Sequence, residues 1–262
     1  MSDRLKKIIQ TGFCLVLLLI VLIPSDIRTV SADLNTTRPS KNGHLHVEET
    51  QLKDEKGNVA FLKGISTHGL TWYPEFIDEG LFKGLSEEWD CNLIRLAAYS
   101  SEYHKGKKKE TLDVVFEGIE AAIAADMYVL VDWHTMIDER PEDFRDDAVE
   151  FFTIVTDRYG NDPHLLYEVC NEPGGDWLTV KEYADGIIPV IRSKAPDAVI
   201  IIGTPNYCQD LHYPAIDPLS LDNIMYSAHF YSATHGKELR EQIDRTIHSG
   251  LPGSISPSRR TT

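Results

Sequence analysis

Six short apolar segments of the chain each end in, or lead into, residues whose side chains can do chemistry. The fourth segment ends in Asn171-Glu172-Pro173, and its carboxylate, Glu172, is the centre of the functional prediction. Near the ends of the other five lie an arginine, three histidines and five aromatic residues: His68, Trp72, Tyr73, Arg95, Tyr99, His134, Tyr207, His229 and Tyr231. Together these side chains offer acid, amide, imidazole, guanidinium and flat aromatic groups.

Each of these residues also has a purely structural interpretation. A histidine at the end of a strand is commonly a hydrogen-bonded polar residue. Asn-Glu-Pro can cap a helix, and Trp72 and Tyr73 can pack in a core or at its rim. Residues of this kind recur at six successive segment ends, which argues against coincidence. In a parallel barrel the C-terminal ends of the strands surround one mouth, so these side chains would lie together.

Sugar chemistry needs this combination of groups. Aromatic faces stack on pyranose rings, amide and imidazole groups bind hydroxyls, and two carboxyl groups cleave the glycosidic bond. We expect the acid of such a pair to have a raised pKa, since it is partly buried beside a second carboxylate.

The elements that must position these residues alternate between apolar runs and amphipathic stretches, which predicts βα units and a parallel sheet. Residues 45–52 and the turn 54–58 predict an opening hairpin. The predicted barrel strands are 59–65, 92–98, 127–133, 165–170, 199–203 and 224–230. The predicted helices are 79–88, 112–125, 143–159, 180–194 and 237–249.

The fold class is therefore α/β, a (β/α)8 TIM barrel that is incomplete here. About six βα units are countable. Residues 253–262 are too short and too polar for another strand and helix, so strands seven and eight are expected to be missing. The domain is placed at 43–252, after a lead-in at 33–42, and 253–262 is expected to be an unrelated tail.

Residues 1–32 have the pattern of a secretory signal peptide. Arg4, Lys6 and Lys7 precede an apolar run at 13–23, and small residues at 30–32 offer a cleavage point. The run is short for a membrane span, which needs about 20 residues; an uncleaved anchor is the alternative. We expect a secreted, extracellular protein that does not remain in the membrane after cleavage.

The formal net charge of −15 argues against nucleic acid and anionic membranes as partners, because both need a basic surface. A neutral polysaccharide is compatible with this charge. Cys91, Cys170 and Cys208 each lie in or beside an apolar run, which favours buried free thiols over a disulfide or a metal site. We expect no metal, no cofactor and a monomer.

Five segments carry a resemblance to a known family. They are 63–70 (KGISTHGL), 94–99 (IRLAAY), 131–134 (VDWH), 167–173 (YEVCNEP) and 229–236 (HFYSATHG). From about 43 to 252 the chain resembles the family 5 glycoside hydrolases, within the cellulase-type clan of (β/α)8 barrels. It is most similar to bacterial endo-β-1,4-glucanases, which implies a retaining glycosidase that cleaves β-1,4-glucan internally.

The resemblance also implies roles for the residues above. Glu172 looks like the general acid/base, Asn171 like the residue that binds the sugar 2-hydroxyl, and Arg95 like the arginine that orients the nucleophile. The expected polar shell around the cleaved bond is His134, His229 and Tyr231. The expected substrate-binding residues are His68, Trp72, Tyr73, Tyr99 and Tyr207, the last standing where many relatives have tryptophan.

One departure from the family pattern bears on activity. The family nucleophile is a Glu at the end of strand seven, and after Tyr231 this sequence has only Glu238, Glu241 and Asp244, in a predicted surface helix. We therefore expect no nucleophile in this chain and impaired hydrolysis. A frame change or premature stop in the coding sequence is one hypothesis for this departure.

Two other functions are alternatives. The first is a non-catalytic carbohydrate-binding or degraded gene product of the same fold. The second is a metal-dependent hydrolase using His68, His134 and His229, for which no HxH or HExxH spacing gives support. The sequence does not separate glucan from mannan or xyloglucan.

Overall fold

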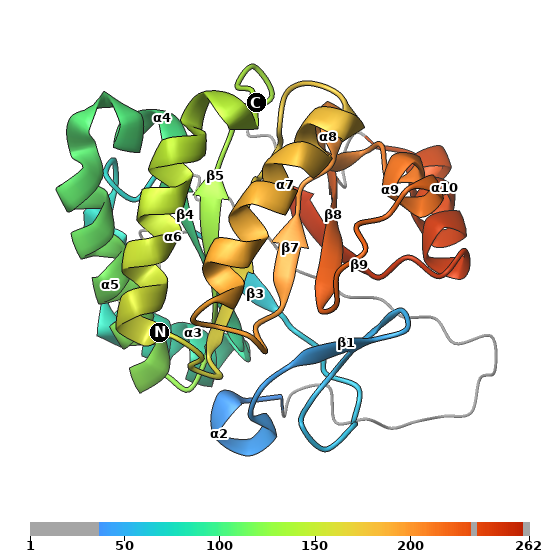
Figure 1. The fold of residues 1–262 in the computed structure, drawn as a ribbon. Coiled ribbons are helices and arrows are strands. Elements are labelled where there is room, and N and C mark those ends of the chain that lie inside the picture. Colours follow the sequence, from blue (N-terminus) through green and yellow to red (C-terminus); the bar gives the residue numbers. More distant parts are fainter. Residues whose placement is uncertain (1–36, 232–234, 259–262) are drawn as a thin grey trace.

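Seven parallel strands form one curved sheet, with helices packed along its outer side (Figure 1). The computed structural model describes residues 37–231 and 235–258, without the side chains of Tyr231 and 253–258. The sheet runs in chain order through β3 (Gly64–Ser66), β4 (Leu93–Tyr99), β5 (Tyr128–His134), β6 (Leu165–Glu168), β7 (Ile200–Ile202), β8 (Ile224–Tyr231) and β9 (Gly253–Ser258). Each strand pairs in parallel with the next, as expected for part of a barrel.

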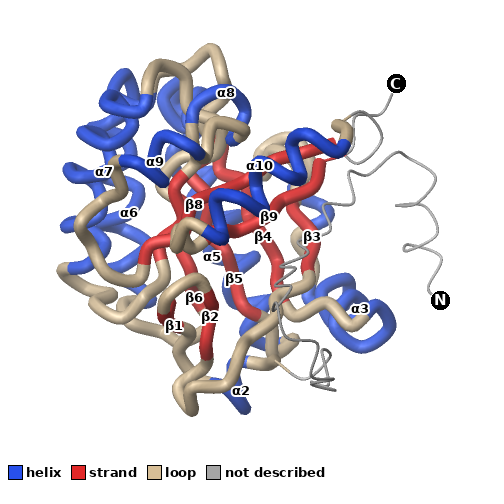
Figure 2. Tube along the Cα trace, turned by 90° about the vertical axis from the view of Figure 1, so that its right-hand side faces the viewer, coloured by secondary structure: helices blue, strands red, loops and turns tan. Residues whose placement is uncertain are grey.

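Helices connect the strands. The longer ones are α3 (Glu79–Trp89), α5 (Lys108–Ala124), α6 (Arg145–Tyr159), α7 (Trp177–Arg192) and α10 (Lys237–His248). The short ones are α2 (Pro39–Asn42), α4 (Ser100–Glu102), η1 (Pro74–Phe76), η2 (Tyr103–Lys107), η3 (Pro141–Phe144), α8 (Pro205–Cys208) and α9 (His212–Ile216). Figure 1 and Figure 2 both show α9 and α10 near β8 and β9, and the strand order places β3, which precedes α3, at the opposite end of the sheet.

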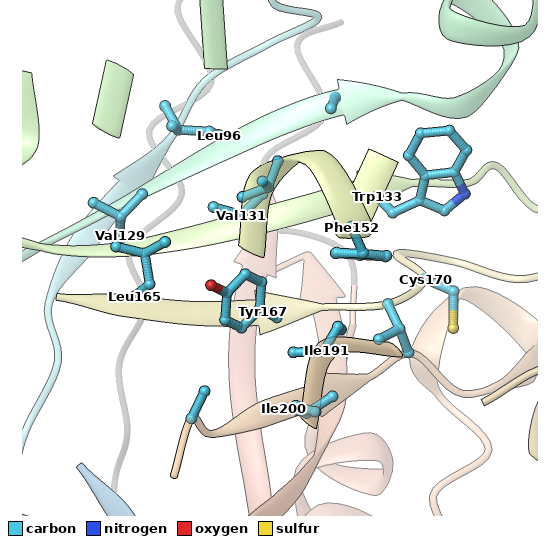
Figure 3. Packing of buried hydrophobic residues seen from close by; sticks show 14 of the residues in the cluster. Leu96, Val129, Val131, Trp133, Phe152, Leu165, Tyr167, Cys170, Ile191 and Ile200 are labelled. Atoms are coloured by element: carbon cyan, nitrogen blue, oxygen red, sulfur yellow. The ribbon is translucent and has the colours of Figure 1, made fainter. Parts of the chain in front are cut away.

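The outer face of the sheet is apolar from β3 to β8. Alternate residues of a strand point to opposite faces, and those facing the helices form the main core. Figure 3 labels ten of its members, from four strands, two helices and the segment after β6: Leu96, Val129, Val131, Trp133, Phe152, Leu165, Tyr167, Cys170, Ile191 and Ile200.

The inner face changes character along the strands. Near the strand beginnings it is apolar and packs against the hairpin of β1 (His46–Glu48) and β2 (Gln51–Lys53), which lies below the sheet in Figure 1. This second core contains Leu45, Leu52, Ala60, Leu62, Leu93, Tyr128, Leu130, Leu166, Val199, Ile201 and Met225. Further along β4, β5, β6 and β8 the same face carries buried polar residues: Arg95, Asp132, Glu168, Ser227 and His229. The fold therefore closes one end of the sheet with hydrophobic packing and leaves the other end for polar groups.

The six predicted barrel strands correspond in order to β3–β8, and the five predicted helices to α3, α5, α6, α7 and α10. Helix α7 begins three residues before its predicted start because Asp176 caps it, its side chain accepting a hydrogen bond from the Thr179 backbone N–H at 2.9 Å. Helix α5 likewise begins at Lys108 instead of residue 112. The buried setting predicted for Cys91, Cys170 and Cys208 is confirmed.

The opening hairpin differs from the prediction. Its tight turn lies at Glu49 and Thr50, where Glu49 has a φ of 56°, and the predicted turn at 54–58 is a second turn after β2. Asp54 holds that second turn, because its Oδ1 accepts from the backbone N–H groups of Lys56 and Asn58. The first barrel strand is consequently short, Gly64–Ser66 instead of 59–65.

The expected incomplete barrel is confirmed, but the expectation that strand seven is missing is wrong. Gly253–Ser258 pair in parallel with Tyr226–Tyr231 as β9. A parallel ladder is made by backbone N–H and C=O groups, and an edge strand tolerates a residue such as Pro257, so polar side chains did not prevent pairing. Sheet strand seven therefore exists, although its sequence contains no carboxylate.

The predicted signal peptide, residues 1–32, lies outside the described residues. In the part of the chain that the structure describes, no helix is long and apolar enough to cross a membrane.

Candidate active site

Arg95 is the centre of a buried cluster of charges beneath the mouth of the sheet. Its Nε donates to Glu168 Oε2 at 2.7 Å, and its Nη2 lies 2.9 Å from Asp132 Oδ2. The three side chains come from the neighbouring strands β4, β5 and β6, on the inner face. All three are almost completely buried, so the pairing is needed to offset the cost of removing charges from water.

The pKa values of this cluster follow from burial and pairing. Burial raises the pKa of Asp132 to about 7, although Arg95 works against this rise. Burial likewise raises the pKa of Glu168, again opposed by Arg95. The pKa of Arg95 is raised, because the two carboxylates outweigh the effect of burial.

Asn171 and Glu172 follow β6 directly and are fixed by the cluster and by the segment after β5. The Asn171 side chain accepts from Arg95 Nη2 at 2.8 Å and donates to the Thr135 carbonyl at 3.0 Å. The Glu172 backbone N–H donates to the same carbonyl at 3.2 Å. The Asn171 amide and the Glu172 backbone are thus held by hydrogen bonds to the same carbonyl, that of Thr135.

The Glu172 carboxylate meets a histidine from β8. Its Oε1 lies 2.8 Å from His229 Nδ1, and the Glu172 side chain is 13% exposed. Burial raises the pKa of Glu172, but the His229 hydrogen bond and nearby positive groups outweigh it, so the pKa is lowered overall. The expectation of a raised pKa is wrong for this chain, because the group beside Glu172 in the described structure is an imidazole and not a second carboxylate.

His134, at the end of β5, binds Asp132 two residues earlier on the same strand face. His134 Nδ1 lies 2.6 Å from Asp132 Oδ2. Burial, followed by the charge of Arg95, lowers the pKa of His134 to about 3. The ring is therefore neutral at ordinary pH.

An aromatic wall continues from His134 across the mouth toward β3. We use this name for His134, Tyr99, Trp72, His68 and Tyr73. The centroids of Tyr99 and His134 are 4.3 Å apart, and those of Trp72 and Tyr99 are 4.6 Å apart. His68 lies 5.3 Å from Trp72 and 5.7 Å from Tyr73. Trp72 and Tyr73 are 43% and 45% exposed, which leaves aromatic surface for a ligand.

Two predicted site residues remain, one without a contact to this constellation among the described residues and one whose side chain is not described. Tyr207 follows β7 and is 41% exposed, with no aromatic contact to the wall among the residues described. Its segment is unusual, because Asn206, Tyr207 and Cys208 all have φ values near +56°. Tyr231 ends β8, and its side chain lies outside the described part of the structure.

The acidic residues of α10 are a surface feature, as expected. Glu238 and Asp244 are exposed, and Glu241 forms an ion pair with Lys237 at 3.0 Å on the same helix. Within the described ranges, no three His, Cys, Asp or Glu side chains are placed to hold a metal ion.

The sequence reasoning missed Asp132 and Glu168 as site residues. Both lie within quoted segments, and each is a carboxylate inside an otherwise apolar strand. Charged residues are almost never fully buried unless they are paired. That signal, together with Arg95 in the neighbouring strand, could have predicted the cluster.

Comparisons with known proteins point to one family. The family model described as cellulase (glycosyl hydrolase family 5) matches residues 53–255. The chain is 41% identical over 231 residues to endoglucanase A of Butyrivibrio fibrisolvens, covering 85% of this chain and 53% of that protein. It is 34% identical over 260 residues to an endoglucanase of Clostridium saccharobutylicum, covering 96% of this chain and 57% of that protein. The chain thus spans about half the length of these curated relatives.

Solved structures of endoglucanases and cellulases are also similar to this chain. The catalytic domain of Thermobifida fusca endoglucanase Cel5A superposes with a TM-score of 0.79 at 33% identity, covering 83% of this chain and 74% of that one. A variant of that domain in complex with cellotetraose has a TM-score of 0.78. The cellulase Cel5C_n has a TM-score of 0.78 at 38% identity, covering 81% of this chain and 69% of that one.

Proposed function

This chain belongs to the cellulase family, glycosyl hydrolase family 5, and on that premise we propose that it acts on β-1,4-glucan with Glu172 as its acid/base. Its relatives are named endoglucanases, and one related structure holds cellotetraose. The observation that carries the proposal is the placement of Glu172. It is a nearly buried carboxylate at a strand end, fixed by His229 and Thr135 and set beside Asn171 and Arg95.

In a retaining glycosidase, Glu172 would first protonate the leaving oxygen and would then activate water against a glycosyl-enzyme. The second carboxyl group in such enzymes lies about 5–5.5 Å from the first. Asn171 would bind a sugar hydroxyl, and His134, His229 and Tyr231 would complete the polar shell. The aromatic wall, with Tyr207, would stack on the sugar rings.

We also propose that the 262-residue chain, by itself, hydrolyses glucan poorly. Asp132 and Glu168 are buried and paired with Arg95, so neither is free to attack an anomeric carbon. Covalent catalysis therefore finds no sugar acceptor in these two carboxylates, the buried ones nearest to Arg95 in the described structure. The lowered pKa of Glu172 agrees with this, because a neighbouring carboxylate would raise it toward the range of a general acid.

Hydrolysis of carboxymethyl cellulose by the purified chain tests these statements together. We expect a rate orders of magnitude below that of a complete endoglucanase, and loss of the remainder in Glu172→Gln. Glu238→Gln, an exposed carboxylate on α10, is the matched control and should change nothing. Full turnover by the 262-residue chain would contradict the proposed impairment, and residual activity unaffected by Glu172→Gln would contradict the proposed role.

A second function, carbohydrate binding without hydrolysis, is favoured by one observation. Trp72 and Tyr73 keep nearly half of their surface exposed at the mouth. Calorimetric titration with cellotetraose would show binding that Trp72→Ala weakens and Glu172→Gln leaves unchanged. Binding combined with measurable product release would instead favour the enzyme.

Secretion remains a proposal that rests on residues 1–32. Expression of the full chain in a secreting bacterium should give an extracellular product whose first residue follows Ala32. An intact amino terminus on the membrane fraction would indicate the uncleaved anchor. We likewise propose a monomer, which light scattering on the purified protein would test.

A further inference from the structure

Asp132 and His134 form a pair that ties the charged cluster to the aromatic wall. They lie two residues apart on β5, so both side chains leave the same face of the sheet. Asp132 Oδ2 lies 2.6 Å from His134 Nδ1 and 2.9 Å from Arg95 Nη2. One carboxylate oxygen therefore serves both the guanidinium and the imidazole.

The hydrogen between Asp132 and His134 can be assigned from these contacts. A guanidinium is always charged, so Asp132 Oδ2 lies 2.9 Å from a permanent positive charge on Arg95. The adjacent positive charge favours the ionised carboxylate, which has no hydrogen to give. The hydrogen in the 2.6 Å contact then belongs to His134 Nδ1.

The imidazole carries no second hydrogen. Burial and the nearby Arg95 lower the pKa of His134, which favours the neutral imidazole at neutral pH. With Nδ1 protonated, Nε2 on the far side of the ring bears a lone pair. No hydrogen-bond partner of Nε2 lies among the described residues. The Tyr99 ring, 4.3 Å away at 31°, packs against the imidazole and restricts its rotation.

We propose that Asp132 is a positioning residue, which holds His134 as the neutral, Nδ1-protonated tautomer and so makes Nε2 a hydrogen-bond acceptor at the mouth of the barrel. The group that fits such a nitrogen is a hydroxyl that donates its hydrogen. That this hydroxyl belongs to a sugar rests on the proposed function. The tautomer itself does not depend on it.

The competing arrangement places a hydrogen on Asp132. Burial raises the pKa of Asp132 to about 7, so below that pH a protonated Asp132 could donate to Nδ1 and leave the ring hydrogen on Nε2. His134 would then be a donor toward the mouth. The two arrangements differ in which ring nitrogen carries the hydrogen, and above that pKa the proposal requires the hydrogen on Nδ1.

Nitrogen-15 NMR of the histidine-labelled full chain, at about pH 8, decides between them. The signals of His134 are assigned by their disappearance in His134→Gln. We expect Nδ1 to show a bound hydrogen and Nε2 to resonate as an unprotonated nitrogen. A hydrogen found on Nε2 in the unmodified protein would overturn the proposal without any variant being needed.

Variants test whether Asp132 is the cause. Asp132→Ala removes the acceptor and should release the ring to a mixture of tautomers, whereas Asp132→Asn keeps an oxygen and should preserve most of the Nδ1-protonated form. Glu168→Gln is the matched control, because it removes a carboxylate charge from the same Arg95 without touching His134. A tautomer that is unchanged in Asp132→Ala, or equally disturbed in Glu168→Gln, would refute a positioning role.

Cellotetraose binding gives the functional readout. Asp132→Ala and His134→Ala should each weaken binding about tenfold, and the double variant should lose little more, because one contact is removed in all three. Independent, additive losses would overturn the coupling between the two residues. Absence of binding in the unmodified chain would contradict the proposed function, while the NMR result would still decide the tautomer.

Discussion

Replacing Arg95 with methionine would leave two carboxylates in the interior without their cation. Asp132 and Glu168 are 0% and 1% exposed, and Arg95 contacts both, at 2.9 Å and 2.7 Å. Removing one partner of a buried ion pair costs about 3–5 kcal/mol, because the remaining charge stays in a low-dielectric site. Methionine has a similar length, so the loss reports charge more than volume.

The loss should depend on pH in a definite direction. Burial raises the pKa of Asp132 from 3.8 to about 7, so the folded state binds this proton more tightly than the unfolded state. Stability therefore falls as pH rises through that range and is lowest above about pH 7. Without Arg95 both carboxylates should hold protons still more tightly. We expect the destabilisation by Arg95→Met to be largest at about pH 8 and smaller at about pH 5.

Urea unfolding at both pH values, followed by tryptophan fluorescence, measures this. The control is Arg158→Met, whose pair with Glu120 spans 3.3 Å between half-exposed side chains and should contribute about 0–1 kcal/mol. Arg95→Met combined with Glu168→Gln should recover part of the loss, since one orphaned charge is gone. A loss that is the same at both pH values, or no larger than that of Arg158→Met, would refute the reasoning.

Three further changes test other parts of the structure. Gly203→Ala should destabilise the fold by about 1–3 kcal/mol, because the added Cβ would clash with the backbone carbonyl of Asn171; urea unfolding would show it, and an unchanged midpoint would contradict the close approach. Trp72→Ala should weaken cellotetraose binding about tenfold in calorimetry and leave the thermal midpoint nearly unchanged, because the side chain is 43% exposed; a large stability loss with intact binding would place it in the core instead. Asp176→Ala should cost about 1 kcal/mol in urea unfolding through loss of the α7 cap on Thr179, and Asp176→Asn should restore most of it.

The local sequence pattern was enough to predict those strands and helices whose formation depends little on contacts with the rest of the fold. Strands β4, β5 and β8 could be predicted from their apolar runs, and helix α5 from its 3.6-residue periodicity. These patterns favour strand or helix wherever the segment lies in the fold. Element boundaries and β9 were less predictable. Pairing of Gly253–Ser258 depends on the free edge of β8, which no property of the tail itself reveals.

Some features of the candidate site could likewise be predicted from the sequence, and others depended on the tertiary structure. The sequence by itself determined the family, the acid/base candidate Glu172 and the aromatic residues His68, Trp72 and Tyr73, because residue types at strand ends are visible in one dimension. Only the tertiary structure decided which of these groups meet. Three strands bring Asp132 and Glu168 against one guanidinium, and β8 brings His229 to within 2.8 Å of Glu172. The protonation of a carboxyl group depends on such distances. A neighbouring imidazole lowers its pKa, whereas a neighbouring carboxylate raises it.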